Sequence, residues 1–440
     1  MFLHLQGVFV KNFRLVALGL IFVVAVLLHI GFANGVLKEE RTLDSGVKVP
    51  VSAHDVWQAY ADGVDDVALG APFRQYGMRT NVGGKEFRST LVEFPFGSSV
   101  AVDSVEADSA GNGGVGSDSA ATDVEEGAGV ESAQNVAGAK PAQVAVGAKP
   151  VRGIILYVHG YNDYFFQKEM AQKADSAGYA FFAIDLHYCG RSFAPGDRRG
   201  DLRNMREFFP ELDFAVELAR VITKERTGRA HSLPLVLIGH SQGGLLVSFY
   251  AESRPAEKFA ALVLNSPFFD FNFNWLVRNV AIPVVSELAM YLPDFSIGSS
   301  GNPNYAYAIN RERYGEWQYN TEWKSEERPE QFLGWIRGVH RAQLELHKGF
   351  HINSPVLVLH GDCSDDDDEW SDDQMHCDGV LDVEHIEMWA PKVGTKVTTE
   401  TVAGGLHDLY LSRKDVRDEA YAKTFRFIDE SLRGAGSADD

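Results

Sequence analysis

Cysteine is scarce in this chain, with three residues in 440: Cys189, Cys363 and Cys377. The cysteine–histidine spacing of a structural zinc site is absent, so the sequence predicts no zinc-binding domain. Positive charge is also in short supply, because 41 Lys and Arg face 61 Asp and Glu, and the net charge is −20. This excess argues against nucleic acid as a general partner. The length allows one large domain with insertions or two domains, and a hydrophobic content of 45% is typical of a globular protein with a core.

The acidity is concentrated in three short segments. Residues 97–150 hold eight acidic residues and two lysines, residues 362–378 hold nine acidic residues and no Lys or Arg, and the chain ends in two aspartates. The remaining body is close to neutral, so the net charge says little about a substrate. Residues 97–150 also contain no Phe, Tyr or Trp. Such a segment buries too little apolar surface to offset its ordering entropy, and we predict a disordered insertion in a surface connection.

The N-terminus carries a long apolar run, "LVALGLIFVVAVLLHIGFANG", preceded by Lys11 and Arg14. The run is long enough to cross a bilayer, and its basic flank predicts an N-terminus in the cytoplasm and an exported remainder. Residues 1–35 are therefore either a single membrane anchor or a cleaved signal peptide, and both alternatives stay open. The expected location is the cell membrane or the secreted fraction.

The acidic loop after residue 361 is flanked by two of the three cysteines. An exported protein can keep a disulfide, so we hypothesise that Cys363 and Cys377 pair and that Cys189 is unpaired and buried. Clustered carboxylates could also bind calcium. The run "DDDDEWSDD" lacks the spacing of an EF-hand loop, and a solvated acidic loop is the favoured interpretation.

Strand and helix patterns alternate over most of the chain after residue 150. Apolar, β-branched runs at 153–160, 179–186, 233–240, 259–267 and 354–362 are typical of strands covered on both faces. Helical patterns between them predict an α/β fold with a mostly parallel sheet flanked by helices. The alternation stops in an aromatic, helix-rich stretch that we expect to cap the strand ends. The predicted organisation is an N-terminal anchor or signal (1–35), a spacer and first hairpin (36–96), the insertion (97–150), the core (151–267), the cap (268–350), the rest of the core (351–434) and a tail (435–440).

The pentapeptide "GHSQG" at 239–243 fits G-x-S-x-G between a predicted strand and a predicted helix. In that context the turn is sharp enough to project the serine hydroxyl above the sheet, and Ser241 is the candidate nucleophile. A serine needs an oriented base. His407 follows the last predicted strand in a glycine-rich loop, from which it could reach Ser241. No cofactor and no metal enter this chemistry.

The sequence offers several candidates for the acid that would orient this histidine. The acid is expected after the strand "PVLVLH". We favour Asp378, where an apolar pattern resumes after the acidic loop, while Asp362 and Asp382 stay open. The expected oxyanion donors are the backbone N–H groups of Gln242, after the nucleophile, and of Tyr161, in the loop after "YVHG".

Taken in order, several motifs resemble the α/β-hydrolases of the monoacylglycerol lipase and lysophospholipase type, often grouped with the serine aminopeptidases. They are "LYVHGYNDYFF", "IDLHYCGRS", "LIGHSQGG", "VLNSPFFD", "PVLVLHGD", "DGVLDVEH" and "GGLHDLYLS". The resemblance covers roughly residues 70–96 and 151–432. It implies an α/β-hydrolase fold with a helical cap after the sixth strand, and a triad of Ser241, His407 and an Asp at the position of Asp378. The insertion, the long acidic loop and the apolar N-terminus depart from this pattern.

Three functions compete at this point. The first is hydrolysis of an acyl ester, such as a monoacylglycerol or lysophospholipid, through an acyl-enzyme; the aromatic cap and a nearby membrane would suit a lipid substrate. The second is an aminopeptidase, for which cap carboxylates would receive the substrate ammonium: Glu316, Glu322, Glu326 and Glu327. The third is a catalytically silent surface-binding scaffold, although neither nucleophile nor base is missing.

Overall fold

The computed structural model describes residues 50–98, 150–229, 233–255, 257, 259–299 and 302–436. The predicted anchor or signal at 1–35, nearly all of the predicted insertion and the last four residues lie outside these ranges, so those predictions stay predictions. Within the described ranges, no helix is long and apolar enough to cross a bilayer.

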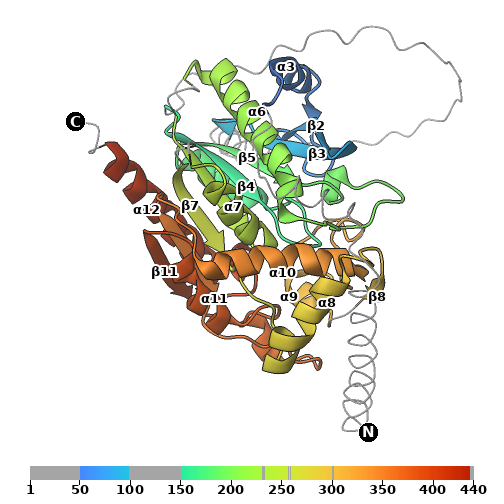
Figure 1. Ribbon diagram of the computed structural model, residues 1–440. Helices are drawn as coiled ribbons and strands as arrows, with labels where there is room; N and C mark the ends of the chain where they lie inside the picture. Colours follow the sequence, from blue (N-terminus) through green and yellow to red (C-terminus); the bar gives the residue numbers. More distant parts are fainter. Residues whose placement is uncertain are drawn as a thin grey trace, which may run out of the picture.

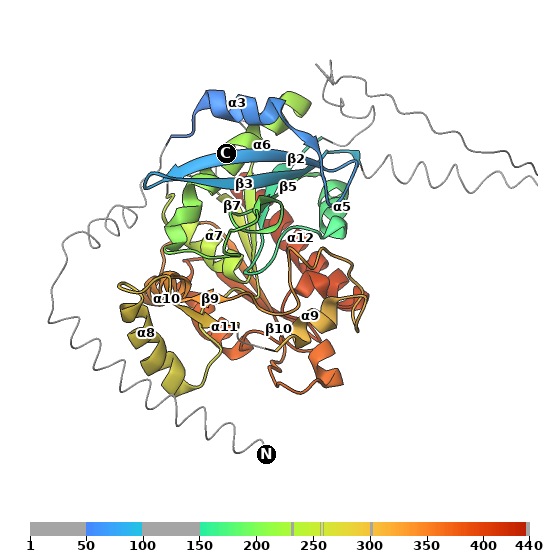
Figure 2. The same cartoon turned by 90° about the vertical axis from the view of Figure 1, so that its right-hand side faces the viewer.

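A nine-stranded sheet forms the centre of the molecule, in the order β1-β2-β3-β5-β4-β6-β7-β10-β11 (Figures 1 and 2). Every neighbouring pair from β5 to β11 is parallel, whereas β1, β2 and β3 join antiparallel. The predicted mostly parallel sheet is confirmed. The strands are β1 Val64–Asp65, β2 Arg74–Val82, β3 Lys85–Phe94, β4 Gly153–Val158, β5 Tyr179–Asp185, β6 Leu235–His240, β7 Phe259–Asn265, β10 Val356–Gly361 and β11 Val397–Val402.

Helices cover both faces of the sheet, which explains why the central strands are apolar without alternation. Along β4, Ile154 and Leu156 face the core shared with α6 and α7, while Ile155 and Tyr157 face the core shared with α5 and α12. Figure 2 shows α7 on one side of the strands, and α5 and α12 on the other. The covering helices are α3 Ala53–Ala61, α5 Lys168–Ser176, α6 Phe209–Thr227, α7 Gln242–Glu252, α11 Val383–Trp389 and α12 Lys414–Gly436.

The predicted first hairpin is confirmed as β2 and β3, which pair antiparallel from Arg74↔Glu93 to Val82↔Lys85. Its two-residue turn is Gly83-Gly84, and both glycines have positive φ (61° and 87°), the backbone that such a turn requires. Helix α3 begins after Ser52, whose hydroxyl accepts the Asp55 N–H, and it packs against α6.

The chain leaves the sheet after β7 and returns at β10, and the residues between them include the segment predicted as a cap. This segment contains a π-helical turn (Val277–Ala281), α8 Ile282–Leu288, α9 Asn304–Ile309 and α10 Leu333–Lys348, with β8 Ser296–Gly298 paired to β9 Gln331–Phe332. It is less helical than the sequence suggested. The stretch after Asn310 turns back on itself, because the N–H groups of Arg313 and Gly315 both donate to the Asn310 carbonyl.

Candidate active site

The nucleophile candidate occupies a strained turn between β6 and α7. Ser241 has φ 53° and ψ −119°, outside the regions that a non-glycine residue favours. Its glycine neighbours leave room for this turn. A Cβ built on Gly239 would lie 2.5 Å from the Gly243 carbonyl oxygen, and one on Gly243 would lie 2.4 Å from the His159 carbonyl oxygen. The glycines of G-x-S-x-G are therefore required by contact as well as by the turn.

A hydrogen-bonded chain joins the three residues that the sequence singled out. His407 Nε2 lies 2.9 Å from Ser241 Oγ, and His407 Nδ1 lies 2.9 Å from Asp378 Oδ2. All three are buried, with exposed fractions of 8% for Ser241, 3% for His407 and 0% for Asp378. The residues come from three loops that follow β6, β10 and β11. Because those strands are parallel, their carboxyl ends meet at one edge of the sheet, where α/β proteins place their sites.

Asp378 is held by its own loop, which separates it from the other two acid candidates. Its Oδ1 accepts the N–H groups of Val380 and Leu381, each at 2.8 Å, which leaves Oδ2 for His407. Asp362 instead accepts the Gly404 N–H, and Asp382 caps α11 by accepting the Glu384 N–H. The structure therefore brings Asp378 to the histidine and places Asp362 and Asp382 elsewhere.

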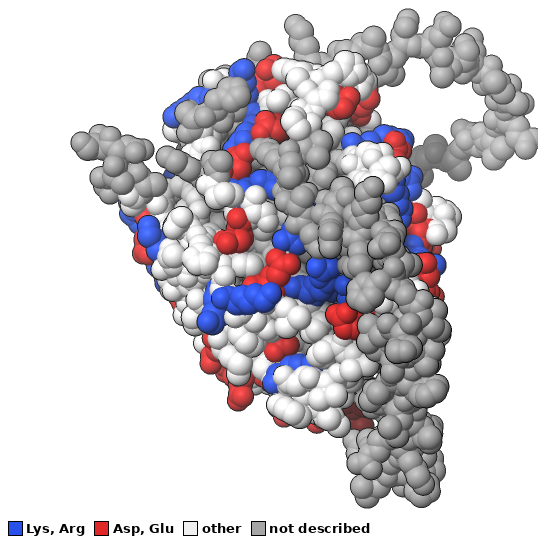
Figure 3. Space-filling view, in the orientation of Figure 1, with Lys and Arg blue, Asp and Glu red and all other residues white. Residues whose placement is uncertain are grey.

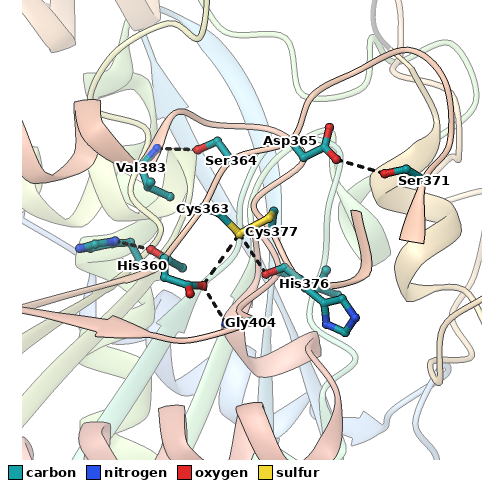
Figure 4. Close-up of a disulfide and its surroundings, with 12 residues drawn as sticks. His360, Cys363, Ser364, Asp365, Ser371, His376, Cys377, Val383 and Gly404 are labelled. Carbon is teal, nitrogen blue, oxygen red and sulfur yellow. Dashed lines mark hydrogen bonds between the residues drawn. A yellow bond between two sulfur atoms is a disulfide. The ribbon is translucent and has the colours of Figure 1, made fainter. Parts of the chain in front are cut away.

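The hypothesised disulfide between Cys363 and Cys377 is confirmed. Figure 4 shows it where the acidic loop begins and ends. The Cys363 carbonyl accepts the Asp378 N–H at 2.9 Å, so the bridge lies directly against the acid. Cys189 is unpaired and buried, as expected. Among the described residues, the acids of this loop form no group with convergent metal-ligating atoms.

The two predicted oxyanion donors belong to segments that adjoin the serine. Gln242 is the first residue of α7, so its N–H has no acceptor inside the helix, and the helix dipole adds positive potential there. The loop of Tyr161 is in contact with the serine, since a Cβ built on the preceding Gly160 would lie 3.1 Å from Ser241 Cβ. The cap also reaches this place: Trp335 of α10 donates its indole N–H to the Gln242 side chain at 3.0 Å.

A buried polar layer beneath the site was not anticipated from the sequence. Asp408, next to the histidine, accepts hydrogen bonds from Asn265 (2.7 Å) and Gln167 (3.2 Å). Asn265 ends the otherwise apolar β7, and a polar residue at that position was the available signal. Nearby, Asp163 forms a buried ion pair with Lys324 of the cap segment at 2.9 Å.

In the described part of the chain, one group of side chains is close enough together to hold a metal ion: Asp163, His240 and Asp408 have possible ligand atoms within 4.8 Å of one another. Lys324 and Asn265 already satisfy two of its members. The arrangement is that of a hydrogen-bonded core rather than of a cation site, and we base no chemistry on it.

A comparison with protein families matches the model for serine aminopeptidase, S33, over residues 149–411, which is more than half of the chain. The chain belongs to this family. Its fold is that of the α/β-hydrolases, and the predicted enzyme class, a serine hydrolase, is confirmed.

Among curated proteins, a monoacylglycerol lipase of Mycolicibacterium smegmatis is 27% identical over 218 residues, covering 48% of this chain and 70% of that protein. The phospholipase YtpA of Bacillus subtilis is 28% identical over 115 residues, covering 26% of this chain and 40% of that protein. A solved monoglyceride lipase from Saccharomyces cerevisiae is 18% identical with a TM-score of 0.47, over 65% of this chain and 88% of that one.

Proposed function

We propose that this protein hydrolyses carboxylic esters with an acyl chain, of the monoacylglycerol or lysophospholipid kind. The observation that carries the proposal is the buried chain of hydrogen bonds from Ser241 through His407 to Asp378. The curated relatives with lipase and phospholipase names support the same substrate class.

In the proposed mechanism, His407 Nε2 takes the proton of Ser241 Oγ as the oxygen attacks the ester carbonyl. Asp378 holds the Nδ1–H of His407, which fixes the tautomer and stabilises the imidazolium that forms. The N–H groups of Tyr161 and Gln242 would bind the developing oxyanion. His407 then protonates the leaving alcohol, and a water molecule activated by the same histidine releases the acid from the acyl-enzyme.

The cap supports an apolar substrate. Its first half exposes large hydrophobic side chains that no described part of the chain covers: Phe273, Trp275, Leu276, Val280, Tyr291, Leu292, Phe295 and Ile297. Uncharged residues dominate the surface over α8 in Figure 3. Exposed apolar surface of this kind favours contact with lipid.

Export is the second part of the proposal: we infer that residues 1–35 anchor or direct the chain across the membrane. The Cys363–Cys377 disulfide supports an oxidising compartment. Protease accessibility of a C-terminal tag on intact cells, together with N-terminal sequencing, would separate an exported anchored chain, a cleaved chain and a cytoplasmic one.

Two of the four cap carboxylates that the aminopeptidase alternative could use already form ion pairs. Glu316 pairs with Arg417 at 2.6 Å and Glu326 pairs with Arg313 at 3.1 Å, so neither is available to a substrate ammonium without breaking an ion pair. Peptide hydrolysis in the absence of ester hydrolysis would restore this alternative.

The decisive experiment is labelling of the purified protein by a fluorophosphonate probe, with Ser241→Ala beside it and p-nitrophenyl esters of increasing chain length. We expect labelling of the wild type only, and a fall in ester turnover of about 10⁴-fold or more in the variant. A folded wild-type protein that neither labels nor turns over esters would leave the scaffold hypothesis in its place.

A further inference from the structure

Two partly buried arginines stand out because, within the described part of the chain, no carboxylate forms an ion pair with them. Other buried guanidinium groups in this chain form ion pairs, for example Arg191 with Asp66 and Arg254 with Asp213. Among the described residues, no Asp or Glu lies within ion-pair distance of Arg199 or Arg328. A buried charge without a counter-charge is costly, and the cost is notable in a chain with a net charge of −20.

Arg199 lies against the loop that holds the proposed oxyanion donor. A Cβ built on its neighbour Gly200 would be 2.8 Å from the Tyr161 ring, so the two segments are in contact. Arg199 donates to the hydroxyl of Ser325 at 2.9 Å and to the Glu322 carbonyl, which are neutral acceptors. Its Nε is buried and donates to no described residue.

Arg328 follows a segment that is tied to the same loop. Asn162, next to Tyr161, donates to the Ser325 carbonyl at 3.0 Å and accepts from the Ser325 hydroxyl. Three residues further along, the Arg328 guanidinium has no hydrogen bond to any described residue, and its side chain is half-buried. The acidic groups near enough to act on its pKa are Tyr161, Asp366 and Asp378.

Burial lowers the pKa of both arginines below the ordinary value, and nearby acidic groups do not offset it. In most ion-paired arginines with a shifted pKa, such as Arg191 and Arg254, the carboxylate partner raises the pKa instead. Two arginines without an ion pair to a described residue therefore act electrostatically on Tyr161, whose loop is in contact with the nucleophile.

We propose that Arg199 and Arg328 form an anion subsite for an ester substrate whose alcohol part carries a phosphate. This inference rests on the proposed ester hydrolysis. A fatty acyl chain bears no charge, so the anion belongs to the leaving alcohol. The two guanidinium groups carry two positive charges, which match the two negative charges of a phosphomonoester. Their planar N–H donors suit the phosphate oxygens. A substrate with a single carboxylate would neutralise only one of the two arginines.

The test compares two substrates that share an acyl chain, a monoacylglycerol and its 3-phosphate, below their critical micelle concentrations and at fixed ionic strength. The readout is the ratio of kcat/KM for the phosphate ester to kcat/KM for the neutral ester. Arg328→Gln should lower this ratio about tenfold to a hundredfold, because a hydrogen bond to a charged group is lost. Arg199→Lys, which retains the charge but loses the planar donors, should lower it less.

Arg311→Gln is the matched control, since Arg311 is an exposed cap arginine whose guanidinium, among the residues that the structure describes, donates only to the side-chain oxygen of Gln318 at 3.0 Å. It should leave the ratio as in the wild type. An unchanged ratio in Arg328→Gln would overturn the subsite.

Inorganic phosphate separates a headgroup from a free anion. If it inhibits neutral ester hydrolysis through Arg328 while the phosphate ester is not hydrolysed, the substrate assignment is wrong. Fluorophosphonate labelling and neutral ester turnover by the wild type test the proposed function independently, so the two failures are distinguishable.

Discussion

At the scale of single residues, the choice among three aspartates has a direct chemical consequence. Asp378→Asn should lower kcat about 10²- to 10⁴-fold, because an amide can donate to His407 Nδ1 and favour the tautomer that cannot accept the serine proton. Steady-state ester kinetics with folding checked by circular dichroism would measure this change.

Two controls are built into the same loop. Asp362→Asn and Asp382→Asn retain an oxygen that can accept the Gly404 and Glu384 N–H groups, and Asn is as good an N-cap as Asp. Both should keep kcat within about threefold of the wild type. A loss at Asp362 or Asp382 as large as that at Asp378 would show that the hydrogen bond to His407 is not what matters.

His240, beside the nucleophile, should make the fold sensitive to acid. Burial lowers its pKa from 6.5 to about 4, with the charge of Asp408 acting in the opposite direction. Between these two values the unfolded chain binds the proton and the folded chain does not, so the free energy of unfolding falls as the pH drops from about 6.5 to 4. The contribution of this residue is roughly 2–4 kcal/mol.

Urea denaturation at pH 7, 5.5 and 4.5 would measure this dependence in the wild type and in His240→Gln. The variant is expected to be less stable at pH 7, because His240 Nδ1 lies 3.3 Å from the Asn265 carbonyl oxygen, but its stability should fall less steeply with acid. Parallel pH curves for the two proteins would assign the acid sensitivity to other groups.

At the scale of elements, the disulfide couples the acidic loop to the proposed acid. Replacing both Cys363 and Cys377 by Ser should lower the free energy of unfolding by about 3 kcal/mol, the value for a loop of this length. It should also lower kcat more than it changes KM, because the Asp378 N–H donates to the Cys363 carbonyl.

Reduction of the wild type offers the matching experiment without a substitution. A dithiol reductant should lower its kcat toward that of the double variant and leave the variant unaffected. Thiol titration would establish that the bridge is open. Full activity of a completely reduced wild type would mean that the Val380 and Leu381 N–H groups position Asp378 alone.

The same elements show which parts of the structure the sequence could predict. The central strands were predictable because burial on both faces leaves a continuous apolar run, and the hairpin because Gly83-Gly84 allows one tight turn. Ser241 and His407 were proposed from their place in loops that follow strands, and the structure brings their side chains within hydrogen-bond distance. The choice of the acid among Asp362, Asp378 and Asp382 stayed open, because it depends on the path of the loop after β10, which the sequence does not give. Helix α10 lies within the stretch predicted as a helical cap, but the hydrogen bond from Trp335 to Gln242 was not predictable, because it joins residues almost a hundred positions apart.

At the scale of the whole molecule, the described flanks of the predicted insertion lie at the end of the sheet opposite the proposed active site. The insertion precedes β4, whereas Ser241 follows β6, and the two strands are parallel neighbours. One strand length of six residues, about 20 Å, separates these ends. Changes in the insertion should therefore leave the chemistry intact.

The two ends of the insertion also lie near each other. The Gly97 N–H donates to Asp175 at 2.6 Å, and the Arg152 N–H donates to the Gly178 carbonyl at 2.8 Å, so both flanks contact the end of α5.

A linker of about eight Gly and Ser residues could replace residues 99–149. Loop closure then costs less entropy, and we expect the protein to be about 1–2 kcal/mol more stable, with unchanged kcat/KM for a soluble ester. Thermal unfolding and ester kinetics of the two proteins would measure both quantities. A lower melting temperature would mean that the replaced residues pack on the fold, and a lower turnover would mean that they act on the substrate; either result would contradict an unstructured surface connection.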